Sequence, residues 1–297
     1  MQPFQRKWQR DFRNAGYRAI CAGMAATDII GIPFMKMHGL GNDFVVIDRR
    51  QGGAKVTPRI ARSAGDRRRG VGFDQLAVIE PDHEAAAMLT FFNPDGSVSA
   101  ACGNATRCIA RHLMNETGQD ALTLRTERGM LACEDAGDGM TRVNMGTPLT
   151  EWREIPLAQS ADTLHLPIDG DPVATSMGNP HCSFFVEDAE SIDLASLGPE
   201  VEHHPLFPER TNVQFASVLR RDHLRMRVWE RGTGVTPASG SLSCAVAVAA
   251  VRRGLSGRKV TLDVDGGRIW VDWRNDGVWM TGPTTHVFDG QLRLEEL

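Results

Sequence analysis

The sequence lacks any apolar stretch long enough to cross a membrane, since a transmembrane helix needs roughly 18 or more consecutive apolar residues. It also lacks a basic excess: the net charge of −4 provides no global field that would attract nucleic acid or anionic lipid. The one basic cluster, Arg67–Arg69, lies between glycines, which predicts a solvated loop. We therefore expect a cytoplasmic protein that binds neither membranes nor nucleic acids.

The six cysteines lack the spacing of a small disulfide framework or of paired zinc ligands. They are Cys21, Cys102, Cys108, Cys133, Cys182 and Cys244. A chain of 297 residues, 41% of them hydrophobic, builds a core without disulfides, so reduced cysteines are expected. No His, Cys and Asp cluster has metal-ligand spacing, and neither glycine-rich nucleotide motif follows a strand. We expect no metal and no cofactor.

Residues 1–34 differ in composition from the rest, because they are Arg-rich and then briefly apolar. We expect an N-terminal extension there, for which disorder is one option. A signal peptide is disfavoured because the apolar part is short and full of small residues. A start codon placed too far upstream is the alternative, with Met24, Met35 and Met37 as internal candidates.

The chain repeats itself at an offset of 137 residues. The matching positions are Gly41-Asn42 with Gly178-Asn179, Gln75 with Asn212, Asn93 with Glu230, Val98-Ser99 with Val235-Thr236, and Ala101-Cys102-Gly103 with Ala238-Ser239-Gly240. Such matches without a gap indicate a duplication, and therefore two similar domains that face each other across a cleft. Glycine and proline interrupt the pattern in "NMGTPLTEW", which predicts the boundary near residue 150.

Each half combines many strands with one strongly apolar helix. Strands are predicted in "DFVVID", "LTFFN", "LACEDAG", "CSFFVED", "RMRVWE", "VTLDVDGGRIWVDWR" and "VWMTGP". One helix should begin near Gly103 and its counterpart near Gly240, with Gly254 as a C-terminal stop. The fold class is therefore mixed α/β (α+β), with sheet wrapped around each helix.

Cys102 and Ser239 occupy equivalent positions at the predicted helix N-termini. Unpaired backbone N–H groups and the helix dipole should lower the pKa of the Cys102 thiol and bind a carboxylate. Two such N-termini in one cleft could hold one substrate carboxylate and stabilise negative charge on the adjacent carbon. An acid/base group on each face of that carbon would make a racemase or an epimerase.

The other matched polar residues complete a candidate pocket. They are Asn42, Gln75, Asn93, Asn179, Asn212 and Glu230, with Arg231 beside them. Glu230 can accept hydrogen bonds from an ammonium group, and Arg231 can bind a second carboxylate. His38 and His181 lie beside the Gly-Asn motifs, either as helpers at the site or as packed, hydrogen-bonded side chains.

Seven stretches in the same order resemble the diaminopimelate epimerase family. They are "MHGLGNDFVVID", "GFDQL", "FFNPDGSVSAACGNATRCIAR", "MGNPHCSFFVED", "ERTNVQF", "RVWERGTGVTPASGS" and "GPTTHVFDG". The resemblance implies two pseudo-symmetric domains, 35–150 and 151–284, each a strand-rich barrel around a central helix, with the strand 285–297 returning to the first. It implies interconversion of LL- and meso-diaminopimelate, for lysine and peptidoglycan synthesis, by a cytoplasmic homodimer that uses neither pyridoxal phosphate nor metal.

The resemblance also implies roles for individual residues. Cys102 matches one of two catalytic cysteines. The residues that match substrate-binding positions are Asn42, Gln75, Asn93, Asn179, Asn212, Glu230 and Arg231, with Gly103, Asn104, Gly240 and Ser241 as backbone donors to the reacting carboxylate.

Ser239 departs from the family pattern A-C-G-[ST]-G, and so does Leu242 in place of the later glycine. A thiol has a pKa of about 8.5, whereas a hydroxyl is closer to water at about 15.7. Three hypotheses follow: an epimerase weakened at Ser239, a one-base dehydratase or racemase of another amino acid, and a catalytically silent amino-acid-binding homologue.

Overall fold

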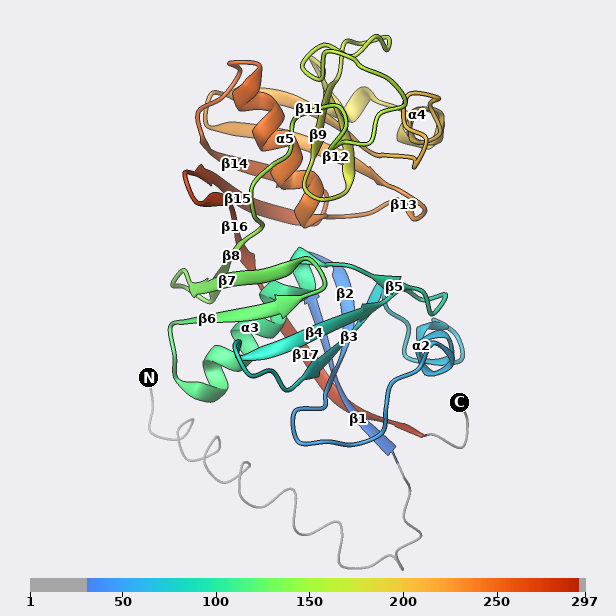
Figure 1. The fold of residues 1–297 in the computed structure, drawn as a ribbon, viewed down its shortest axis with the longest axis vertical. Coiled ribbons are helices and arrows are strands. Elements are labelled where there is room, and N and C mark those ends of the chain that lie inside the picture. The colour runs from blue at the N-terminus through green and yellow to red at the C-terminus, as the bar shows by residue number, and fades with distance from the viewer. Residues whose placement is uncertain (1–30, 294–297) are drawn as a thin grey trace, which may run out of the picture.

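The computed structural model describes residues 31–293, so residues 1–30 of the predicted extension over residues 1–34 lie outside this range. The chain forms two strand-rich halves, and each half wraps its strands around one helix (Figure 1). All described strands belong to one hydrogen-bonded sheet system. The predicted mixed α/β class is confirmed.

The first half contains eight strands and two helices in chain order. They are β1 (Gly31–Gly39), β2 (Asn42–Asp48), α2 (Pro58–Gly65), β3 (Gln75–Glu80), β4 (Ala87–Phe92), β5 (Val98–Ser99), α3 (Gly103–Thr117), β6 (Ala121–Thr126), β7 (Gly129–Asp135) and β8 (Met140–Asn144).

The second half repeats this order, and the last strand returns to the first half. The elements are β9 (Val173–Ser176), β10 (Pro180–Phe185), η1 (Ala189–Ser191), α4 (Leu194–Glu202), β11 (Asn212–Arg220), β12 (His223–Glu230), β13 (Gly234–Val235), α5 (Gly240–Arg252), β14 (Lys259–Val264), β15 (Gly267–Arg274), β16 (Gly277–Pro283) and β17 (Thr285–Arg293). The strands and both helices predicted from the sequence are confirmed.

Strand registers repeat with the same offset as the sequence. The parallel ladder between β2 and β3 pairs Phe44 with Gln75, and the ladder between β10 and β11 pairs His181 with Asn212, 137 residues later in each strand. Register in a sheet is specified by which face is buried, so two equal ladders require equal burial patterns. The duplication therefore extends from the polar motifs to the backbone hydrogen bonds.

An approximate twofold axis passes through the ladder that joins the halves. Strands β8 and β16 are antiparallel and pair Val143 with Met280, which are themselves 137 residues apart. On either side of this pair, Arg142 lies opposite Thr281 and Asn144 lies opposite Trp279. Equivalent residues can face each other only where a twofold axis passes between them, so Met280 lies close to that axis.

The chain ends of the described region meet in the first half. Strand β17 pairs antiparallel with β1 from Gly31 opposite Arg293 to His38 opposite Thr285. Strand β1 begins at Gly31, four residues before the predicted start of the first domain, because Ile32 and Phe34 are buried. The predicted boundary near residue 150 falls between β8 and β9 and stays a prediction.

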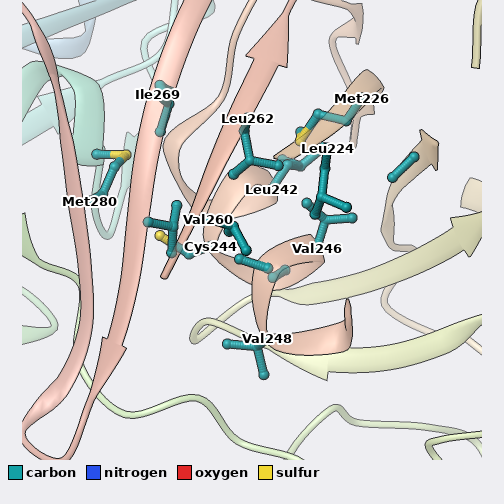
Figure 2. Packing of buried hydrophobic residues seen from close by; sticks show 14 of the residues in the cluster. Leu224, Met226, Leu242, Cys244, Val246, Val248, Val260, Leu262, Ile269 and Met280 are labelled. Atoms are coloured by element: carbon teal, nitrogen blue, oxygen red, sulfur yellow. The ribbon is translucent and has the colours of Figure 1, made fainter. Parts of the chain in front are cut away.

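Each central helix fills the core of its half. Of α5, only Ser241 and the C-terminal residues Val251 and Arg252 are not fully buried, and a helix that is apolar all round needs such an enclosed place. Figure 2 shows Leu242 of α5 among Leu224 and Leu262, which come from β12 and β14. Helix α3 packs in the same way against the strands of the first half.

Two further observations concern the region from Gly31 to Arg293. Within it, no helix is both long and apolar enough to span a bilayer. No three His, Cys, Asp or Glu side chains in this region group closely enough to hold a metal ion.

Candidate active site

Cys102 and Ser239 are the N-cap residues of the two central helices, and their local structures match. Both have extended backbones, with φ of −146° at Cys102 and −143° at Ser239. The hydroxyl of Thr106 donates to the Cys102 carbonyl at 2.8 Å, and that of Ser243 donates to the Ser239 carbonyl at 2.7 Å. These bonds fix the first turn of each helix in the same way, four residues after the cap.

The two side chains make different hydrogen bonds. The Cys102 sulfur accepts the N–H of Ala105 at 3.4 Å and so caps α3. Ser239 makes no such cap, because its hydroxyl donates to Glu230 Oε2 at 3.2 Å. Between residues 31 and 293, the N–H groups of Gly240, Ser241 and Leu242 face no acceptor in the structure, so α5 begins with free donors.

The two helix N-termini converge at Met280. A methyl group added at Gly240 would lie 3.0 Å from the Met280 sulfur, and one added at Gly103 would lie 3.3 Å from Met280 Cε. The same position at Gly240 is 3.5 Å from Asn104 Oδ1. Since helix N-termini attract anions, this junction combines two half-positive ends at one place. The predicted convergence is therefore present in the structure.

Asn42 and Asn104 form a hydrogen-bonded chain beside the start of α3. The amide of Asn104 donates to Asn42 Oδ1 at 3.1 Å, and the amide of Asn42 donates to Asp74 Oδ2 at 2.7 Å. Asp74 in turn pairs with Arg67, whose other partner is Asp43. Arg67, Arg68 and Arg69 are all exposed, as the solvated-loop prediction requires, and Arg67 also pairs with the acidic groups behind Asn42.

Glu230 accepts hydrogen bonds from two hydroxyls of the second half. Thr236 donates to Oε1 at 2.6 Å and Ser239 donates to Oε2 at 3.2 Å. Burial raises the pKa of the Glu230 carboxyl, the two hydroxyl donors act in the opposite direction, and the nearby charge of Asp74 raises the pKa further. Glu230 is therefore a carboxylate held next to Ser239 with more basic character than an ordinary glutamate.

The predicted lowering of the Cys102 pKa is wrong for the free chain. Burial raises the pKa of the thiol to about 12, and the negative charge of Glu230 across the junction adds to this, while the N–H groups of Ala105 and Asn104 lower it. Desolvation of a thiolate outweighs the helix N-terminus here. At this pKa, Cys102 carries its proton at neutral pH in the free chain.

The remaining candidate residues form hydrogen bonds inside their own halves. In the first half, Gln75 donates to Asn93 Oδ1 at 3.1 Å. In the second half, Asn212 accepts the backbone N–H of Arg231 at 3.0 Å, and Asn179 Oδ1 lies 2.9 Å from His181 Nε2. The side chain of Arg231 donates to the carbonyl of Glu209 at 2.9 Å.

The two histidines differ in their surroundings. His181 is fully buried, and burial together with the charges of Arg128 and Arg231 lowers its pKa to about 3. It is therefore a neutral side chain that orients Asn179. His38 is half-buried and accepts a weak 3.5 Å bond from the Gly41 N–H within the turn after β1.

The sequence interpretation did not single out Asp74, Thr236 or Met280. Thr236 is the counterpart of Ser99 in the repeat, and this match was the available signal for it. Asp74 matches Thr211 at the offset and so does not keep its charge, and Met280 matches the apolar Val143, so only their positions in the fold reveal their contacts. Leu242 is fully buried in the core and does not line the junction.

Comparison with known proteins supports one family. The family profile described as diaminopimelate epimerase matches residues 34–150 and 173–287. The chain belongs to the diaminopimelate epimerase family. It is 51% identical to the diaminopimelate epimerase of Rhodospirillum centenum, covering 87% of this chain and 91% of that protein. It is 50% identical to that of Acidiphilium cryptum, covering 88% and 96%.

Solved structures with low sequence identity share the fold. A hydroxyproline epimerase from Agrobacterium vitis, with bound trans-4-OH-L-proline, has a TM-score of 0.64 at 16% identity, covering 89% of this chain and 93% of that chain. A protein of the PhzF phenazine biosynthesis family from Bacillus anthracis has a TM-score of 0.65 at 14% identity, covering 88% and 99%. These similarities show that the same fold also occurs in proteins of other families.

Proposed function

We propose that this chain interconverts LL- and meso-diaminopimelate by acid/base chemistry at Cα, without a cofactor, as an isomerase of the cytoplasmic lysine pathway. The observation that carries the proposal is the meeting of two equivalent helix N-termini at Met280, with Cys102 capping one and Ser239 the other. The carboxylate next to the reacting carbon would bind between the N–H groups of Gly103, Asn104, Gly240 and Ser241. These donors would also stabilise the negative charge that develops when the Cα proton leaves.

On one face of the reacting carbon, Ser239 and Glu230 would act as a unit. The Ser239 oxygen takes the Cα proton while its own proton passes to Glu230 Oε2, to which it is already hydrogen-bonded. A carboxylate has about four lone-pair sites, so Glu230 can also accept a hydrogen bond from the substrate ammonium. The raised pKa of Glu230 makes it a better proton acceptor than an exposed glutamate.

On the opposite face, Cys102 would exchange the second proton. Its thiol is protonated in the free chain and can deliver a proton to the Cα carbanion. Burial is the main cause of the raised thiol pKa, and the charge of Glu230 adds to it; a substrate ammonium near Glu230 would offset this added part and so favour the thiolate needed for the reverse direction. The other polar residues of the candidate pocket, Asn42, Gln75, Asn93, Asn179, Asn212 and Arg231, would bind the distal amino-acid end.

Nuclear magnetic resonance in D₂O tests this proposal directly. The protein is incubated with LL-diaminopimelate and, separately, with meso-diaminopimelate. We expect loss of the Cα–H signal together with formation of the other stereoisomer in both experiments. Exchange with retention of configuration would show one-base chemistry, and the absence of any exchange would contradict the proposed epimerase activity.

We further propose that two copies pair through the edge strand β17. Within the described residues, β17 pairs only with β1, and its residues from Thr285 to Phe288 are all exposed. Val287 and Phe288 are 51% and 47% exposed, although large apolar side chains on a strand are normally covered. A second copy of this chain would cover both side chains and satisfy the free backbone groups of the edge.

Replacing Phe288 by aspartate should turn the dimer into a monomer, because a carboxylate cannot be buried in such an interface without a partner. Light scattering after gel filtration should show the molar mass fall by about half. Leu219→Asp is the matched control, since Leu219 is 54% exposed on β11 of the other half and should leave the dimer intact. A wild-type protein that is already monomeric would contradict the proposed interface.

A further inference from the structure

Arg107 in the second turn of α3 is a buried cation for which residues 31–293 supply no anionic partner. Its side chain is fully enclosed, and within the described residues it forms no ion pair. The Nε atom donates to the Pro283 carbonyl at 3.3 Å, and Nη1 lies 3.5 Å from the Met280 sulfur. The Nη2 atom is buried and has no hydrogen-bond partner between residues 31 and 293.

The guanidinium lies beneath the junction of the two helix N-termini. Met280 contacts Arg107 on one side, and its sulfur and Cε lie against Gly240 and Gly103 on the other. One methionine side chain thus separates the cation from the donors that are proposed to hold the substrate carboxylate. Strands β1 and β16 make room for the guanidinium with glycines: a Cβ at Gly39 would lie 2.7 Å from Nη2, and one at Gly282 would lie 3.1 Å from Cζ.

Arg107 breaks the twofold symmetry of the fold. Its counterpart at the offset of 137 is Cys244, a fully buried residue of α5 that interacts electrostatically with the guanidinium. Because Met280 lies on the approximate twofold axis, a residue that touches it is close to its own counterpart. Since α3 has an arginine at this position and α5 has a cysteine, a single guanidinium lies near both helix N-termini.

A lone buried charge is costly, and no carboxylate among residues 31–293 pairs with Arg107 to offset that cost. Burial lowers the pKa of Arg107 from its usual value, but a guanidinium keeps its proton in proteins. The groups that interact with it electrostatically are the thiols of Cys102, Cys108 and Cys244. Of these, only Cys102 lies at the junction, and it is half-buried, whereas the other two are enclosed in the core.

We propose that Arg107 is a positioning residue whose uncompensated charge is matched by the anions formed at the junction, namely the substrate carboxylate and the Cys102 thiolate. The inference rests on the proposed function for the carboxylate, but not for the thiolate, which forms by loss of the Cys102 proton whether or not substrate is bound. Arg107 touches neither the substrate nor the reacting carbon and acts through the field that crosses Met280.

The test is the rate at which iodoacetamide alkylates Cys102, measured from pH 7 to pH 10 and assigned by peptide mass, so that Cys21 and the buried cysteines are followed separately. The charges near Cys102 are Arg107 on α3 and Glu230 on β12, and the nearby thiol is Cys108. In Arg107→Met, alkylation at neutral pH should be about tenfold slower, which corresponds to a pKa rise of about one unit. In Arg107→Lys, which keeps the charge, the rate should stay within about threefold of wild type.

Arg111→Met is the matched control on the same helix. Arg111 is paired with Asp135 at 2.7 Å, so removing it eliminates a cation that is already compensated. This variant should lower the thermal midpoint and leave the alkylation profile of Cys102 unchanged. Arg107→Met should do the reverse, with a slower alkylation and a midpoint that is unchanged or higher, because an unpaired buried charge has been removed.

Cys244→Asp provides a second route if Arg107→Met does not fold. The new carboxylate lies beside the guanidinium, cancels its field and should slow alkylation by a similar factor. Alkylation at the wild-type rate in whichever of these two variants folds would overturn the inference. This assay needs no diaminopimelate. If the chain were not an epimerase, the alkylation results would still be those expected here, so the two proposals can fail independently.

Discussion

Replacing Cys102 by alanine should abolish exchange of the Cα proton of diaminopimelate, with a loss of activity of at least about 10³-fold, as is typical when an acid/base group that acts in a unit is removed. The reason is that Cys102 is the N-cap residue of α3 and, among residues 31–293, the acid/base group whose side chain caps that helix. Cys108 lies in the core of the first half, and its thiol is enclosed there. The measurement is deuterium incorporation from D₂O under the conditions that detect wild-type turnover.

Cys108→Ala is the matched control for this variant. Both substitutions delete one thiol from the same helix, but only Cys102 lies at its N-terminus. Cys108→Ala should retain wild-type exchange, with a small loss of stability for the missing sulfur. Substrate binding by Cys102→Ala, measured by calorimetry, should remain because the backbone donors of both helices are intact. Retained exchange in Cys102→Ala would place the base elsewhere, with Glu230 as the candidate.

The sequence predicted those features that depend on local pattern and on the repeat. Both helix starts follow from a glycine after an N-cap residue and before an apolar run, and α3 and α5 begin at Gly103 and Gly240 as expected. The equal ladders of the two halves follow from equal burial patterns at an offset of 137 residues. The convergence of Cys102 and Ser239 follows from that symmetry.

Features that depend on burial were outside the reach of sequence patterns. The pKa of Cys102 was predicted from its helix N-terminus, whereas burial and the charge of Glu230 from the other half determine its value. Arg107 belongs to "GNATRC", where an arginine on a helix is ordinarily expected to reach solvent. Its enclosure requires Gly39 and Gly282 on strands far away in the chain, and no local pattern links these positions.

Replacing Ser239 by cysteine should raise the rate of epimerisation by orders of magnitude. The difference of about seven pKa units between a hydroxyl and a thiol corresponds to an upper bound of about 10 kcal/mol for using serine as an equally ionised base. The Ser239–Glu230 hydrogen bond recovers part of this difference, because Glu230 can take the serine proton. The gain should appear in kcat more than in KM, since the donors that bind the substrate carboxylate do not change.

Ser239→Ala, compared with wild type and Ser239→Cys, distinguishes a role of Ser239 in proton transfer from a role only as a hydrogen-bond donor to Glu230. If Ser239 and Glu230 act as a unit, turnover should increase in the order alanine, serine, cysteine at position 239. Equal turnover with alanine and serine would instead make Glu230 the acid/base group on this face, and the serine only its hydrogen-bond donor. No gain in Ser239→Cys would mean that the second helix N-terminus does not face Cα, because Leu242 is buried in the core and cannot block a thiol there.

The Ser239→Cys variant also tests the distance between the two helix starts. Disulfides form when Cα atoms approach within about 7 Å, so thiols at both N-caps could join across the junction. Oxidation should then inactivate the variant and dithiothreitol should restore it, whereas wild type should keep its activity because Ser239 offers no second sulfur. Both helix N-termini contact Met280, so the same closeness that would allow one substrate carboxylate to be shared would also allow this bond. If Ser239→Cys epimerises diaminopimelate rapidly but keeps its activity under oxidising conditions, the two thiols do not meet. The two N-cap residues would then lie too far apart to act on one reacting carbon.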